Sequence, residues 1–159
     1  MTVARPALLA LLLGCSPLAQ AAEQLVTIKG VIYAAIPCVI NRNAPISAPF
    51  NDVQIAGIDG QYKTISIGYT LDCSRSATNE LRMQVRGNPA FDPTMLEISG
   101  YDNIGIALKK DGEQWALNSW SNFDTRKPPV LQAVLAKRDA SEIKAGAFKA
   151  SATLVVDYR

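Results

Sequence analysis

The chain has 159 residues, of which 48% are hydrophobic and 19% are charged, and its formal net charge is +2. This length fits one domain with a sizeable core. The balance of 16 basic against 14 acidic residues gives no electrostatic signal for nucleic acid, so no nucleic-acid partner is expected. The sequence contains no histidine, which excludes the usual base of a Ser or Cys nucleophile and the commonest metal ligand.

The first residues predict a secretory signal. One basic residue precedes an apolar run from Ala7 to Leu13, and a small-x-small site ends at Ala21. This pattern predicts a signal peptide over residues 1–21, followed by one domain over residues 22–159. The alternative is a lipoprotein signal that would lipidate Cys15.

The cysteines point to a covalent link. If Cys15 leaves with the signal, the mature chain keeps only Cys38 and Cys73. An even pair in an exported protein predicts a disulfide. It would close a loop of about 35 residues and contribute ~3–4 kcal/mol in the chain-entropy model.

Strand periodicity begins near the front of the mature chain. Residues 24–32 alternate, with Val26, Ile28 and Gly30 on one side. The glycine stands at an inward position, where a side chain is otherwise expected. The simplest interpretation is a first strand that ends before Pro37.

The middle of the chain has several short strand patterns separated by turn signals. Segments 45–55 and 63–73 flank a turn at Asp59-Gly60, and Cys73 is expected to point inward. Further strands are expected at 81–85, 94–99, 104–109 and 115–117, with a hairpin turn at Asp111-Gly112. Residues 119–129 are predicted as a loop, and 130–136 as either a strand or a helical turn.

The last stretch has the most regular alternation. Its inward positions are Phe148, Ala150, Ala152, Leu154, Val156 and Tyr158. This period of two predicts a strand with one buried face. No hairpin partner follows it, so we expect one strand edge to stay open, which favours aggregation unless another chain supplies a strand.

Short strands without a sustained helical period predict an all-β sandwich. No cofactor is expected. A carboxylate pair among Asp52, Asp59, Asp72, Glu97 and Asp102 is one alternative, although solvated loop acids explain them better. A sugar-binding surface of Tyr101, Trp115 and Trp120 is another, set against a packing role for these aromatic side chains.

Four motifs together resemble a known family. Gly146, the alternating residues after it and the penultimate Tyr158 are similar to the C-terminal signature of pilus subunits assembled by the chaperone/usher pathway. Pro37-Cys38, Tyr69-x-Leu71-x-Cys73 and Gly105-Ile106-Ala107-Leu108 resemble earlier motifs of that family, in the same order. The resemblance therefore covers nearly the whole mature chain.

The resemblance implies an incomplete immunoglobulin-like sandwich of six main strands, whose seventh strand is supplied in trans. Residues 22–30 or so would be a donor-strand extension, with Val26, Ile28 and Gly30 facing the receiving groove. The strand from Gly146 to Arg159 would accept first a strand of a periplasmic chaperone, which holds the Arg159 carboxylate, and then the extension of a neighbouring subunit at the outer-membrane usher.

The same resemblance implies a non-enzymatic subunit of an adhesive, cell-surface fimbrium. The apolar extension is shorter than that of major shaft subunits, which favours a minor or tip-adaptor position. The competing interpretation is a complete periplasmic β-sandwich, with or without a lipid anchor, that binds a small molecule or sugar. That protein would pair its N-terminal strand with itself.

Overall fold

The computed structural model describes residues 24–30, 32, 36–139 and 141–159, and the chain divides into two units, residues 1–33 and 34–159. In the first unit, residues 24–30 and 32 form no strand and their side chains are exposed. A first strand over residues 24–32 is therefore wrong for the described positions. The predicted signal peptide and the alternative lipidation of Cys15 fall outside the described residues.

The second unit is built of β-strands that pair in antiparallel fashion, with no α-helix among the described residues. The strands are β1 (Val39–Ile40), β2 (Ile65–Ile67), β3 (Leu71–Asp72), β4 (Glu80–Arg86), β5 (Leu96–Ile98), β6 (Tyr101–Lys110), β7 (Glu113–Trp115), β8 (Ser121–Asp124), β9 (Leu131–Lys137) and β10 (Thr153–Tyr158). Two 3-10 turns are η1 (Asn41–Asn43) and η2 (Ile55–Gly57). This confirms the predicted all-β class.

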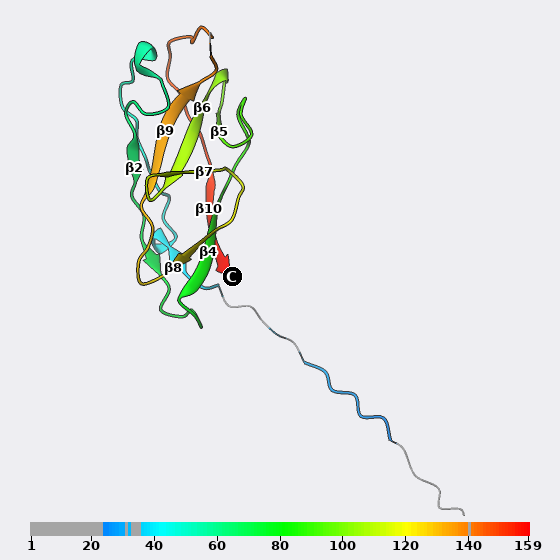
Figure 1. Ribbon diagram of the computed structural model, residues 1–159. Helices are drawn as coiled ribbons and strands as arrows, with labels where there is room; N and C mark the ends of the chain where they lie inside the picture. The colour runs from blue at the N-terminus through cyan, green and yellow to red at the C-terminus, as the bar shows by residue number, and fades with distance from the viewer. Residues whose placement is uncertain (1–23, 31, 33–35, 140) are drawn as a thin grey trace, which may run out of the picture. The chain divides into compact units, whose positions relative to one another are not determined.

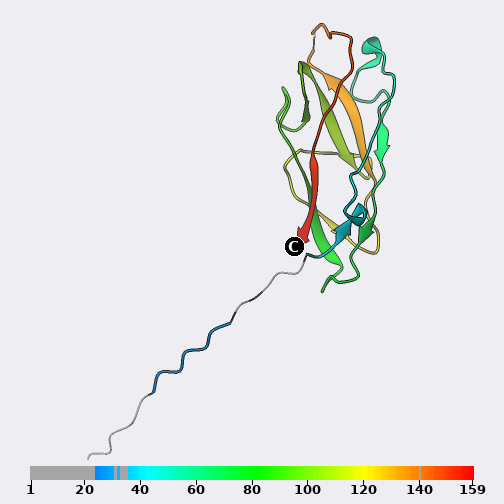
Figure 2. The same ribbon diagram turned by 180° about the vertical axis from the view of Figure 1, so that it is seen from behind.

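The strands form two main sheets and a small one. One sheet has the order β2-β9-β6-β5, with β7 also paired to β6, and the other has the order β10-β4-β8. A third, two-stranded sheet joins β1 to β3. Figures 1 and 2 show the two main sheets as two layers of a sandwich.

The core lies between these layers and follows the alternation of the central strands. Leu81 and Met83 of β4 are fully buried, as are Ile98 of β5 and Leu135 of β9. Because strand side chains alternate, the flanking Arg82 and Arg86 of β4 face outward. In the described part of the chain, no helix is long and apolar enough to span a membrane.

The hairpin after β6 formed as predicted. Asp111 and Gly112 have positive φ values, 54° and 88°. Positive φ at both central residues is what the common two-residue hairpin turn requires. The return strand β7 starts directly after the turn, at Glu113, and pairs with Lys110. It is thus two residues earlier than the predicted 115–117.

The predicted disulfide is confirmed. Cys38 and Cys73 are bonded, with an S–S distance of 2.01 Å and 35 residues between them in the sequence. Cys38 is buried, and the pair lies beside the ladder in which Val39 faces Asp72. The bond therefore fixes the start of the second unit to the end of β3.

Two predicted elements are wrong in extent or type. Residues 119–129 contain strand β8, which pairs with β4, although only Phe123 of that strand packs on the core. The segment 63–73 is two strands, because β2 pairs with β9 whereas β3 pairs with β1. Of the two alternatives for residues 130–136, the strand is confirmed, as β9.

Two further segments are less regular than their alternation predicts. Residues 45–55 form no strand, and the final strand begins at Thr153 instead of Phe148. Both segments nevertheless keep alternating burial, with Phe50 buried and Phe148 half-buried. They lack strand character because neither has a ladder partner in the described structure.

Candidate functional site

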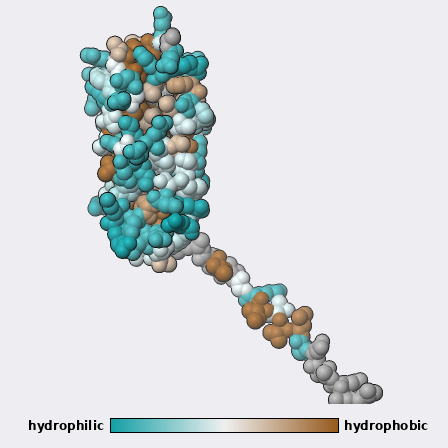
Figure 3. Space-filling model, viewed as in Figure 1, coloured by the Kyte–Doolittle hydropathy of each residue, from teal (hydrophilic) through white to brown (hydrophobic). Residues whose placement is uncertain are grey.

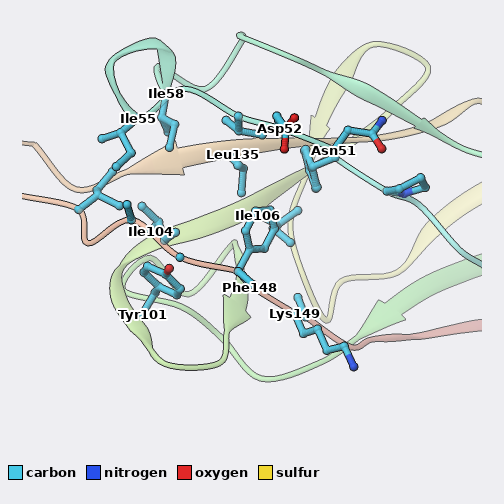
Figure 4. A pocket seen from close by; sticks show the side chains of 18 of the residues that line it. Asn51, Asp52, Ile55, Ile58, Tyr101, Ile104, Ile106, Leu135, Phe148 and Lys149 are labelled. Atoms are coloured by element: carbon cyan, nitrogen blue, oxygen red, sulfur yellow. The ribbon is translucent and has the colours of Figure 1, made fainter.

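The two irregular segments face each other across a groove. Residues 46–56 form one wall, residues 143–150 form the other, and together they border a cavity of about 1240 Å³. Figure 4 shows the side chain of Phe148 directed from the 143–150 wall toward the other side chains that line the cavity. We call this cavity the groove, and its walls the 46–56 wall and the 143–150 wall.

The floor of the groove is the hydrophobic core itself. Ile104 and Ile106 of β6 and Leu135 of β9 line the cavity, and all three are otherwise buried. In Figure 3, apolar surface gathers at the end of the sandwich where η2 lies. A hollow whose floor is core surface leaves that surface available to apolar side chains from elsewhere.

Each wall presents alternate residues to the groove. On the 46–56 wall Ile46 and Ala48 are half-buried and Phe50 is buried, whereas the intervening Ser47 and Pro49 are exposed. On the other wall Phe148 and Ala150 are half-buried and pack against the core.

The two walls come close at one point. The rings of Phe50 and Phe148 lie 5.9 Å apart between centroids, at an interplanar angle of 51°. This distance is within the range of favourable aromatic pairs. The pair therefore spans the groove from wall to wall.

The backbone of both walls is largely unpaired. Among the described residues, no backbone N–H of 46–53 donates to another backbone group, and in 143–152 the only backbone-to-backbone bond is accepted by the Lys149 carbonyl from Ser99. The 46–56 wall is tied instead by a side chain, because Lys63 Nζ donates to the Asp52 carbonyl. Both walls thus keep most backbone donors and acceptors without a backbone partner in the described structure.

The 143–150 wall continues into β10, which is paired on one side. In the β10–β4 ladder Leu154 faces Val85, Val156 faces Met83 and Tyr158 faces Leu81. Val156 is buried, and Leu154 and Tyr158 pack against the core. In the described structure β10 has no ladder on its other edge, so the open edge runs from the groove to the chain end.

The predicted residues of the C-terminal stretch thus have different neighbours. Ala152 is exposed, unlike the inward position that the alternation predicts, because its segment is not in a ladder. At the end of the chain Arg159 pairs with Glu80 at 3.5 Å, and both side chains are exposed. No contact in the structure tests the predicted capture of the Arg159 carboxylate.

Gly146 stands at a narrow point of the groove. A Cβ atom at this position would lie 3.1 Å from the hydroxyl oxygen of Tyr101, which also lines the cavity. The side chain of Tyr101 thus limits the space at the start of the 143–150 wall. The sequence pattern placed Gly146 in the C-terminal stretch, but it placed Tyr101 only in the alternative sugar-binding surface.

Several groove residues could not be recognised from the sequence pattern. The 46–56 wall alternates in sequence, but Pro45 and Pro49 lack the N–H that a central ladder strand needs, and this signal could have marked it as an unpaired wall. The floor residues of β6 and β9 have the ordinary pattern of core strands. Nothing in their sequence distinguishes residues on the floor of the groove from residues in a closed core.

The predicted donor residues are exposed where the structure describes them. Val26 and Ile28 have 75% and 92% of their surface exposed, and a Cβ at Gly30 would meet no atom within 4 Å. The large exposed apolar side chains of this segment also include Leu25 and Ile32. Their role as donors stays a prediction.

The aromatic residues of the alternative sugar surface have separate surroundings. Trp115 is buried, with no hydrogen-bond partner for its indole N–H among the described residues. Trp120 lies beneath two guanidinium groups, with Arg82 Cζ 4.4 Å and Arg86 Cζ 5.7 Å from its ring centroid. Tyr101 lines the groove, so the three residues have packing roles of different kinds.

The loop acids act as local caps. Hydrogen bonds from the backbone of Tyr62 and Gln61 lower the pKa of Asp59, and hydrogen bonds from Ser74 lower that of Asp72. A lowered pKa is the opposite of what a general acid requires. Among the described residues, no group of three metal-ligating side chains forms a site.

Comparison with known proteins agrees with this geometry. The family model described as "Fimbrial protein" matches residues 26–159. The uncharacterised fimbrial-like protein YfcR of Escherichia coli (strain K12) is 32% identical over 91% of this chain and 88% of its own length. The fimbrial-like protein YfcQ of the same strain is 29% identical over 98% of this chain and 99% of its own length.

Solved structures share the fold at lower identity. The P pilus rod subunit PapA has a TM-score of 0.57 and 18% identity, over 77% of this chain and 99% of its own. The P pilus adaptor subunit PapF has a TM-score of 0.56 and 18% identity, over 77% and 96%. A chain of a chaperone–usher pilus has a TM-score of 0.56 and 19% identity, over 91% and 100%. The sandwich thus has the fold of pilus subunits, and the chain belongs to the fimbrial protein family, whose members are structural, non-enzymatic subunits of cell-surface pili.

Proposed function

We propose that the groove accepts an extended strand from another protein, and that this event assembles the chain into a fimbria. The observation that supports the proposal is the pair of unpaired walls above an apolar floor of Ile104, Ile106 and Leu135. A strand laid between the walls would use their free backbone groups and bury alternate side chains on the floor. It would complete the immunoglobulin-like sandwich.

The partners are proposed from the likeness to pilus subunits. A periplasmic chaperone is proposed to supply the first strand, and a neighbouring subunit to replace it at the outer-membrane usher. Before assembly, the unpaired walls are a risk of aggregation, because an open edge beside apolar surface templates pairing with other chains. A chaperone that covers the walls during export would remove this risk.

The segment that this chain donates is proposed to be residues 22–30 or so, after removal of residues 1–21. Its apolar side chains Val26 and Ile28 are exposed, which is unfavourable unless a partner covers them. Burying each in a neighbouring groove contributes ~1.5–3 kcal/mol. Gly30 is expected at a shallow point of that groove.

A minor or adaptor position in the fibre is proposed over a shaft position. The support is the short apolar extension of the sequence, Val26-Thr27-Ile28. The fold likeness does not separate the positions, because a rod subunit and an adaptor subunit match with TM-scores of 0.57 and 0.56. Incorporation counts per fibre, measured by quantitative mass spectrometry of sheared pili, distinguish them: a shaft subunit is the most abundant component.

The proposal is tested by one substitution at each end of the chain. Leu154→Asp places a charge on the core face of β10 and should abolish capture by the chaperone. Ile28→Asp changes only an exposed side chain, so it should leave folding and chaperone capture intact while blocking insertion into the next subunit. Ile28→Val is the matched control and should behave as wild type.

Chaperone-complex yield and subunit exchange are measured side by side for the three variants. Equal loss of folding in Ile28→Asp and Leu154→Asp would contradict the proposal, because it would mean that residue 28 belongs to its own core. A monomer of residues 22–159 that melts cooperatively and gains no stability from an added donor strand would instead support the complete sandwich.

A further inference from the structure

Four charged side chains lie along the edge of the groove, which we call the rim, and most of them are positive. Lys144 and Lys149 are exposed on one wall, and on the other wall Asp52 is exposed with Lys63 bonded to its carbonyl. Among the described residues none of these four side chains forms an ion pair. Three cations against one anion leave a rim charge of +2.

The rim lysine at position 149 lies outside the apolar part of the groove. Its neighbours Phe148 and Ala150 face the core, so Lys149 points to the opposite face of the wall. Figure 4 shows its side chain directed away from the apolar side chains of the cavity. The ammonium group is therefore placed to meet the outward side chains of an inserted strand, not the inward ones.

An inserted strand has two sets of side chains. Its inward residues fill the groove, and its outward residues lie beside the outward residues of the walls at cross-strand distance. On the 143–150 wall the alternation starts at Phe148, because Ile143 packs on the core although it has the parity of Lys149. Within the alternating part of this wall, residues 148–150, Lys149 is the one charged side chain that an outward residue would meet.

We propose that the groove selects its occupant by charge as well as by apolar pattern: it prefers an extended segment with a carboxylate at an outward position facing Lys149, with Lys144 adding to the attraction. This inference rests on the proposed function and specifies the chemistry of the partner strand. It predicts that Lys149 is a specificity-determining residue.

A second copy of this chain has mixed charges in the segment that it would donate. Residues 22–30 contain one carboxylate, Glu23, and one cation, Lys29. Both have the outward parity, because Val26, Ile28 and Gly30 are the proposed inward residues. The rim therefore favours an extension that has an outward carboxylate and no outward cation over the extension of an identical subunit.

The test uses synthetic peptides with the sequence of residues 24–32, added to the chaperone complex of residues 22–159. The neutral reference peptide has Lys29→Gln. Six further peptides place a single Glu or a single Lys at position 25, 27 or 29 of that reference. Glu or Lys at inward position 28 serves as the control for a peptide that cannot bind.

The expected result is that, at one outward position at least, the Glu peptide displaces the chaperone at a concentration about threefold to tenfold lower than its Lys counterpart at low salt. Lys149→Glu in the subunit should reverse this order, and Lys149→Gln should remove it. The carbonyl of residue 149 still accepts from Ser99 in both variants, because that bond uses the backbone.

Two results overturn the inference in distinguishable ways. If the neutral peptide displaces the chaperone but Glu and Lys peptides act alike at all three positions, the charge selection is wrong and the groove function stands. If the neutral peptide does not bind at any concentration, the groove does not accept an apolar strand, and the proposed function is wrong together with this inference.

Discussion

The C-terminal stretch has two halves with different neighbours. Residues 143–152 border an open groove and have almost no backbone partners in the described structure, whereas β10 forms a ladder of six residue pairs with β4. From Phe148 to Tyr158, the even-numbered residues of both halves are apolar. The difference shows that the apolar pattern extends further than the ladder of β10, and the excess lies where the proposed partner strand would bind.

The largest expected effect is on the free energy of unfolding, and it differs between the two faces of β10, the paired half. Val156→Asp puts a carboxylate into the core opposite Met83 and should reduce the free energy of unfolding by ~3 kcal/mol or more. The matched variant Val155→Asp lies on the outward face opposite Gln84 and should cost less than ~1 kcal/mol. Urea unfolding with saturating reference peptide measures both, and equal losses would refute the assigned faces.

Removal of the disulfide is expected to have the next largest effect. Replacing both Cys38 and Cys73 with Ala should lower the free energy of unfolding by ~3–4 kcal/mol, because the bond closes a loop of 35 residues. The same urea experiment measures the loss, and reductant should destabilise the wild type but not the double variant. Identical midpoints for wild type and variant would show that the bond adds nothing to the fold.

A smaller effect on stability is expected at Gly146, which lies in the unpaired half. Ala restricts the unfolded chain, which by itself favours the folded state. The hydroxyl of Tyr101, however, lies 3.1 Å from the place of an added Cβ, so Gly146→Ala should add little stability in the wild type. In a Tyr101→Phe background the same substitution should stabilise by ~0.4–1 kcal/mol. A double-mutant cycle of melting temperatures measures the coupling, and additive effects would show that the hydroxyl does not limit this point.

The smallest effect concerns Asp157 of β10, which pairs with Arg82 of the neighbouring strand β4. Its carboxylate accepts a hydrogen bond from Arg82 at 2.7 Å, and this bond lowers the pKa of Asp157 from its ordinary value of 3.8. The ionised carboxylate therefore stabilises the folded state above that value, and the stabilisation is lost as the pH falls through the folded-state pKa. The side chains are exposed, so the contribution is small.

Melting curves of wild type and Asp157→Asn between pH 2 and 7 check this prediction. The two proteins should differ slightly at neutral pH and converge at the acidic end. A difference that grows on acidification would have the wrong sign for a carboxylate with a lowered pKa.

Strands with partners inside the chain could be predicted from the sequence. The alternation of Leu81, Met83 and Val85 predicted β4, and Asp111-Gly112 predicted the hairpin, because local pattern and tertiary pairing agree there. Strand β8 was missed because its four residues are mostly polar and only Phe123 reaches the core. Pairing with β4 overrides its weak local preference.

The groove could be predicted only in part. The regular alternation of the C-terminal stretch predicted one wall of the groove. Alternation alone does not show which part of a stretch forms a ladder with another strand. The 46–56 wall and the floor of β6 and β9 required the three-dimensional arrangement. Residues such as Ile106 and Leu135 look like ordinary core residues in sequence, and only the open groove above them sets them apart from a closed core.

The most direct test of the account is hydrogen exchange of the wall amides before and after a donor strand is added. We predict that amides of residues 46–53 and 143–152 exchange rapidly in the subunit alone and slow by at least about tenfold with the reference peptide, because they gain ladder bonds. Amides in the β6–β9 ladder should be protected in both states. Strong protection of the wall amides without any donor would contradict the claim that this sandwich lacks a strand.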